Sequence, residues 1–183
     1  RLGLDVNCRW TACVTPLDAE ARLERLEWGI DQLGVVRRDV QHVVVGSGPL
    51  GARLVRRARL QQFAERIVLR PSCDLLPDLL GHVALVWQPG MTAHGGAILD
   101  GMARGVPAVA IEGDAARQLV VDGETGRITP PRPESEFPRR AFDILEDDAL
   151  AARWGAAARD RAERQFPAAR MVEAHLAALG RLE

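Results

Sequence analysis

The chain has 183 residues, which is enough for one domain with a complete hydrophobic core. Its 24 basic and 25 acidic residues give a net charge of −1, which argues against the basic surface of a protein that binds nucleic acid or an anionic membrane. The sequence contains neither a signal peptide nor an apolar run of about 18 residues that would span a membrane. Cys8, Cys13 and Cys73 are too few and too scattered for a disulfide framework or a zinc site, so we expect a cytoplasmic protein without a bound metal.

The first third of the chain alternates between short apolar runs and amphipathic segments. A β-prone run at residues 11–15 is followed by Pro16 and Asp18, which indicate a turn and the N-cap of a helix. Apolar residues then recur three or four positions apart up to Gly34, which we expect to end that helix. Residues 42–45 predict the second strand.

A glycine-rich segment, GSGPLG at residues 46–51, follows the second predicted strand and precedes a helix. It reads as the G-x-G-x-x-G fingerprint of dinucleotide-binding folds. That fingerprint belongs after the first strand, with an acidic residue about 20 positions later. Here the next predicted strand ends in Arg70 instead. An NAD(P)-binding module therefore stays open only as a less favoured alternative. Beyond Arg70, Ser72 or Asp74 is expected to cap a short helix.

The segment at residues 83–111 is the centre of the sequence. A fully apolar run at 83–87 predicts a strand buried on both faces, and a loop then leads to Gly95 and Gly96. A short helix follows, and a second apolar strand occupies 107–111. The first N–H groups of such a helix carry its positive dipole end, so this unit predicts an anion site of phosphate size. Asp100, one turn into the helix, can accept hydrogen bonds from sugar hydroxyls.

The remaining residues predict a helix at 114–121, a strand at 127–129 and helices from Glu134 to the end of the chain. Met171, Leu176 and Leu179 line the last of these helices, which we expect to be structural. Strands that alternate with helices indicate an α/β fold, a Rossmann-like doubly wound parallel sheet of about six strands with a helical C-terminus. Ligands bind at the carboxyl ends of such strands, where Ser47, Ser72, Thr92 and Gly95 should lie.

Two segments carry a family resemblance: DGMARGVPAVA at residues 100–110 and VVDGETGRITPP at residues 120–131. Their spacing resembles the donor-binding, C-terminal domain of GT-B retaining glycosyltransferases of family 4 (group 1), and HVVVGSGP at 42–49 fits in order. The resemblance implies that residues 1–183 form a nucleotide-sugar-binding domain without its N-terminal acceptor domain. The absence of a starting methionine agrees with a domain that begins near an interdomain linker. No cofactor or metal is implied, because a helix dipole and basic side chains stabilise the phosphates.

The resemblance also implies a set of donor-site residues. Asp100 stands where the family has a glutamate that holds the ribose, and Gly95 is expected to admit a phosphate and to allow any positive φ that the turn requires. The other residues assigned to the nucleotide and its phosphates are Gly96, Thr92, His94, Ser47, Gly48 and Ser72. The catalytic residues stay unassigned.

The sequence departs from the family at charged positions. Thr92 replaces the first glutamate of the family's pair, and Gln118 replaces a third glutamate. An arginine and a lysine that neutralise the donor diphosphate are replaced by Pro16 and Ala21, with only Arg22 adjacent. Each lost charge-assisted hydrogen bond is worth roughly 1.5–3 kcal/mol, so donor binding should weaken unless other arginines compensate.

The sequence therefore predicts a glycosyltransferase, of hexosyltransferase type, that transfers a sugar from a nucleotide-diphosphate donor to an unknown acceptor with retention. The isolated segment is expected to be largely monomeric and inactive, because it offers only half of the cleft. The alternative is a degenerate, non-catalytic domain that acts as a binding or scaffolding module.

Overall fold

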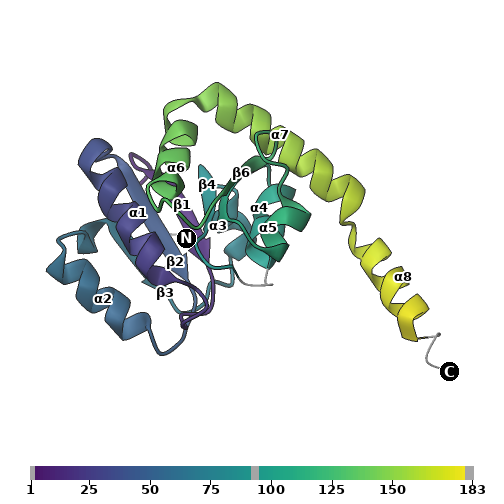
Figure 1. Ribbon diagram of the computed structural model, residues 1–183, viewed down its shortest axis with the longest axis horizontal. Helices are drawn as coiled ribbons and strands as arrows, with labels where there is room; N and C mark the ends of the chain where they lie inside the picture. Colours follow the sequence, from purple (N-terminus) through teal and green to yellow (C-terminus); the bar gives the residue numbers. More distant parts are fainter. Residues whose placement is uncertain (1–2, 92–94, 180–183) are drawn as a thin grey trace.

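The computed structural model describes residues 3–91 and 95–179. Its six strands form one parallel sheet in the order β3-β2-β1-β4-β5-β6 (Figure 1). The strands are β1 (Arg9–Val14), β2 (Val40–Val45), β3 (Ile67–Arg70), β4 (Leu85–Gln88), β5 (Ala108–Ile111) and β6 (Gly126–Thr129). Each predicted strand is present, and the prediction of a doubly wound parallel sheet is confirmed.

Helices cover both faces of the sheet, which explains why the central strands are apolar at nearly every position. On one face, a core forms beneath α1 (Leu23–Val36), α2 (Gly51–Leu60) and α6 (Glu136–Glu146). The opposite face packs against α3 (Leu76–Leu80), α4 (Gly96–Ala103), α5 (Asp114–Leu119) and α7 (Asp148–Gln165). A single 3-10 turn, η1 (Ala64–Arg66), leads into β3.

The last helix, α8 (Ala168–Leu179), extends beyond the body of the domain (Figure 1). Its helical assignment is confirmed, but Met171, Leu176 and Leu179 are each more than half exposed. The physical reason is the length of α7, whose 18 residues span about 27 Å and carry the chain past the sheet before α8 begins.

The first helix starts later than its sequence suggests. The Asp18 carboxylate accepts hydrogen bonds from the N–H groups of Glu20 (3.0 Å) and Ala21 (3.2 Å), so it closes a turn and does not cap the helix. Arg22 then takes a left-handed conformation with φ 50° and ψ 48°, and α1 begins at the next residue. The predicted stop at Gly34 is also wrong, because α1 continues to Val36.

Two other predicted helix ends differ for local reasons. Neither Ser72 nor Asp74 caps α3, which is preceded by Leu75 and has no side-chain cap. Helix α5 ends at Leu119, two residues early, because its last carbonyls are bound from outside the helix. Arg161 of α7 donates to the carbonyl oxygens of Leu119 and Gln118, both at 2.8 Å.

A buried cluster of three hydrogen-bonded side chains joins strands β2, β1 and β4. The Trp87 indole N–H donates to the Thr11 hydroxyl (2.8 Å), whose oxygen lies 2.6 Å from Nδ1 of His42. A hydroxyl has one proton, so donating it to Nδ1 while accepting from the indole satisfies all three groups. Burial lowers the pKa of His42 to about 3, which keeps the ring neutral. The Trp87 ring also packs against Phe137 of α6, with ring centroids 4.9 Å apart.

These hydrogen bonds allow a prediction of the effect of removing the Thr11 hydroxyl. Thr11→Val keeps the shape but leaves the Trp87 N–H and His42 Nδ1 buried without partners, which should lower the free energy of unfolding by about 2–4 kcal/mol in urea denaturation. Thr11→Ser retains the hydroxyl and should lose only about 1 kcal/mol. Equal stability of the two variants would show that the hydroxyl contributes nothing.

Candidate functional site

The strand order reverses between β1 and β4. The loops that follow β1 (residues 15–22) and β4 (residues 89–91) begin at one edge and lead to opposite faces of the sheet. In doubly wound sheets, ligands bind in the crevice outside the carboxyl edge at such a point. The two loops touch: a β-carbon added at Gly90 would lie 2.4 Å from the Glu20 carbonyl oxygen and 3.2 Å from the Ala21 Cα. Ala21 is accordingly only 1% exposed. The two loops are therefore closely packed at the edge where a ligand is expected.

Helix α4 begins at this edge. Gly95 precedes its first residue, and among the described residues no side chain caps the helix. The N–H groups of Gly96, Ala97 and Ile98 precede the first intrahelical hydrogen bond, from Leu99 N–H to the Gly95 carbonyl (3.0 Å). A β-carbon added at Gly96 would meet no atom of the described residues within 4 Å. This helix end combines oriented donors with open space, which suits an anion.

Gly95 packs closely against α5. Its φ is −93°, so the turn needs no positive φ and that expectation is wrong. A β-carbon at Gly95 would lie 2.3 Å from Leu119 Cδ1 and 3.3 Å from Ala115 Cβ. The missing side chain at Gly95 therefore makes room for α5, while the open space lies at Gly96.

Asp100 shares a helix face with Gly96. The buried residues of α4 are Ala97, Ile98, Gly101 and Met102. Gly96 and Asp100, four positions apart and both exposed, lie on the other side, about 6 Å apart along the axis. The carboxylate therefore lies one turn below the free N–H groups.

The GSGPLG segment contacts the loop that follows β1. Leu17 N–H donates to the Ser47 carbonyl (2.9 Å), and a β-carbon at Gly48 would lie 2.5 Å from the Leu17 carbonyl oxygen. The chain itself fills the space that a pyrophosphate takes beside a dinucleotide fingerprint, so the segment is not arranged to bind NAD(P). Ser47, Gly48 and Ser72 are exposed on the loops that follow β2 and β3. Thr92 and His94 lie outside the described residues.

Sequence reasoning missed one charged residue at the crevice. Arg25, in the first turn of α1, directs its Nη1 toward the Pro89 carbonyl oxygen at 3.5 Å and so links the loops that follow β1 and β4. The sequence feature that could have identified Arg25 is its position in the first turn of the helix that follows β1. This feature could be recognised only if the helix start had been placed at Leu23 and not near Asp18.

One buried carboxylate, that of Glu27, takes part in the packing of α1 against α2. Glu27 of α1 is 2% exposed, and its Oε2 lies 3.0 Å from Arg57 Nη1 of α2, close enough for an ion pair but without hydrogen-bond geometry. Burial raises the pKa of Glu27, and the Arg57 charge offsets part of that increase. Glu27 is thus engaged between α1 and α2 and does not face the crevice.

The fold has counterparts among known proteins. A family model described as glycosyl transferases group 1 matches residues 11–147, which is most of the chain. The chain belongs to the group 1 glycosyl transferases. Among curated proteins, none matches its sequence.

Solved structures share the fold of this group 1 glycosyl transferase at low identity. The TarM G117R mutant of S. aureus, in a complex that includes UDP, is 14% identical with a TM-score of 0.87 over 93% of this chain and 35% of that one. Anabaena Alr3699/HepE with UDP and glucose is 20% identical with a TM-score of 0.86, over 95% and 48%. The chain thus spans about a third to a half of these two proteins.

A third structural neighbour has nearly the same chain length as this protein. The C-terminal domain of the group 1 glycosyl transferase LpcC from Francisella tularensis is 13% identical with a TM-score of 0.79, and the match covers 89% of each chain. The sheet and its helices therefore have the Rossmann-like fold of GT-B glycosyltransferases. Among the described residues, no helix is both long and apolar enough to cross a membrane.

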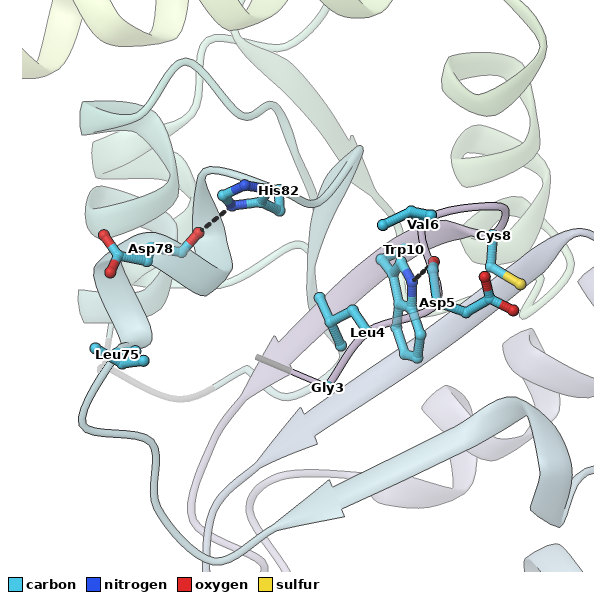
Figure 2. A pocket seen from close by; sticks show the side chains of 9 residues that line it. All are labelled: Gly3, Leu4, Asp5, Val6, Cys8, Trp10, Leu75, Asp78 and His82. Atoms are coloured by element: carbon cyan, nitrogen blue, oxygen red, sulfur yellow. Dashed lines mark hydrogen bonds between the residues drawn. The ribbon is translucent and has the colours of Figure 1, made fainter. Parts of the chain in front are cut away.

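A hollow of about 520 Å³ lies between the segment that leads into β1 and the region of α3 (Figure 2). Residues 3–6 with Cys8 and Trp10 form one side, and Leu75, Asp78 and His82 form the other. Its polar groups are largely engaged: the Trp10 indole donates to the Asp5 carbonyl (2.8 Å), and His82 Nδ1 donates to the Asp78 carbonyl (2.7 Å). Figure 2 shows the Asp78 carboxylate turned away from Leu4 and Trp10. None of the described residues that line the hollow is an arginine.

The two glycines at the start of α4 should respond differently to a methyl group. Gly95→Ala drives a β-carbon into Leu119 and should lower stability by about 1–3 kcal/mol, a fall of several degrees in Tm. Gly96→Ala adds a β-carbon in open space and should leave Tm unchanged or slightly raised. Thermal melts of the two variants measure the difference; an unchanged Tm for Gly95→Ala would contradict the packing described here.

Proposed function

We propose that this chain is the donor-binding, C-terminal domain of a retaining glycosyltransferase of family 4. It would bind a nucleotide-diphosphate sugar for transfer of the sugar to an acceptor held by another domain of the same protein. The chain alone would then bind the donor without transferring the sugar. Family membership supports this function, as do the UDP complexes of the structural neighbours.

The free N-terminus of α4 at the carboxyl edge carries the proposal. Three N–H groups without intrahelical acceptors lie beside Gly96, where a β-carbon would meet no atom of the described residues within 4 Å. The helix dipole adds partial positive charge at the same point. As the bond from the sugar to the diphosphate breaks, negative charge grows on the leaving group, and these donors stabilise it.

Asp100 would hold the ribose. With phosphates on the N–H groups of α4, the attached ribose lies about one helical turn away, which is the distance from Gly96 to Asp100. A carboxylate accepts hydrogen bonds from a pair of ribose hydroxyls without needing a proton of its own. Ser47, Gly48 and Ser72, on the neighbouring loops, would border the nucleotide, and Thr92 and His94 would approach the phosphates and the sugar.

A second candidate function is a degenerate domain that binds a protein partner and no longer binds the donor. The packing of Ala21 favours it. The backbone of Gly90 covers this residue, so a lysine cannot be placed there without moving the loop. Pro16 and Gln118 likewise supply no charge.

Calorimetric titration of the whole chain with UDP and GDP tests the proposal. We expect one of the two to bind with a micromolar Kd. Asp100→Asn should weaken that binding about ten- to thirtyfold, because a neutral amide makes weaker hydrogen bonds to the hydroxyls.

Asp31→Asn is the matched control, since Asp31 is exposed on α1 and the variant makes the same charge change. It should bind as the wild type does. No heat from either nucleotide at millimolar concentration would contradict the donor site and favour the degenerate domain. Unchanged affinity of Asp100→Asn, in a wild type that binds, would remove this residue from the site.

A further inference from the structure

The crevice between β1 and β4 contains a positive charge that helix formation does not explain. Arg25 occupies the first turn of α1, where the helix dipole favours acidic residues and disfavours cations. Its guanidinium reaches across to the loop that leads to α4 and meets the Pro89 carbonyl oxygen at 3.5 Å, the outer limit of a hydrogen bond. A cation thus lies near the N-terminus of one helix and beside the loop that leads to the next.

No carboxylate neutralises this charge. Within the described residues, Arg25 forms no ion pair, whereas arginines elsewhere pair closely, such as Arg9 with Asp148 (2.6 Å) and Arg117 with Glu112 (3.0 Å). Arg22 is 3.8 Å from Glu24, a distance at which attraction is weak for exposed groups. Arg25 is also partly buried, so water shields its charge less than it shields a fully exposed side chain.

An anion bound in the crevice would offset both the unfavourable position of Arg25 at a helix N-terminus and its lack of an ion pair. We propose that Arg25 binds the diphosphate of the nucleotide donor together with the N–H groups at the start of α4. This inference rests on the proposed function. It gives Arg25 the role of the positive charge that Pro16 and Ala21 do not provide. The guanidinium has five N–H donors, and one of them makes a long hydrogen bond to the Pro89 carbonyl oxygen. The other four remain available for phosphate oxygens.

The position of Arg25 also fits the packing of the loops. Gly90 covers Ala21, so the shortest route for a cation into the crevice is blocked. Arg25, four residues after Ala21 and inside the first turn of α1, reaches the same loop at Pro89.

The test compares Arg25→Gln, Arg25→Lys and the wild type in calorimetric titrations with UDP, GDP and their nucleosides. For the diphosphate that binds, Arg25→Gln should lower affinity about ten- to a hundredfold, and Arg25→Lys should retain most of it. Affinity for the nucleoside should change less than about twofold, because it carries no phosphate. Arg56→Gln, an exposed arginine on α2, is the control for net charge and should match the wild type.

The outcomes separate the two proposals. If the wild type binds and Arg25→Gln binds the diphosphate equally well, the role of Arg25 is wrong and the donor site stands. If nucleoside and diphosphate weaken together, or if Gln and Lys variants behave alike, Arg25 acts through structure and not through charge, which also overturns the inference. If the wild type binds neither diphosphate, the donor site and the inference both fail.

Discussion

The reversal of strand order between β1 and β4 is the constraint on which the rest of the structure depends. Because the chain leaves β1 toward one face and β4 toward the other, the two loops diverge from a shared edge, which is where doubly wound sheets bind their ligands. The contact of Gly90 with Glu20 and Ala21 fixes the spacing of the loops, and the group of Thr11, His42 and Trp87 holds the strands beneath them. The start of α4 and the side chain of Arg25 meet this edge only because both loops are held in place.

Most of the fold could be predicted from local sequence. Short β-prone runs, two of them fully apolar, alternate with helical patterns and so predict a parallel sheet, and the six strands were found close to their expected ranges. Helix ends were less predictable, because they depend on distant contacts. The end of α5 is bound by Arg161, which is 42 residues from Leu119, and the exposed face of α8 follows from the length of α7.

The candidate site was predictable in outline and not in detail. A glycine pair before a short helix indicated an anion site, but no local pattern shows which glycine faces α5 and which faces solvent. Gly95 packs against Leu119 and Gly96 is open, a distinction made by the path of α5. Arg25 was missed for a similar reason, since its importance comes from the carbonyl of Pro89, 64 residues away.

The central claim is that a nucleoside diphosphate binds at the start of α4, and amide chemical shifts test it most directly. In a titration of the isotopically labelled chain with UDP and GDP, the account predicts that the largest saturating shifts fall on the backbone N–H groups of Gly96, Ala97 and Ile98. The same titration with the nucleoside should leave these signals nearly unchanged. Binding that shifts the residues around the hollow beside α3, while leaving the signals of Gly96 to Ile98 in place, would contradict the account.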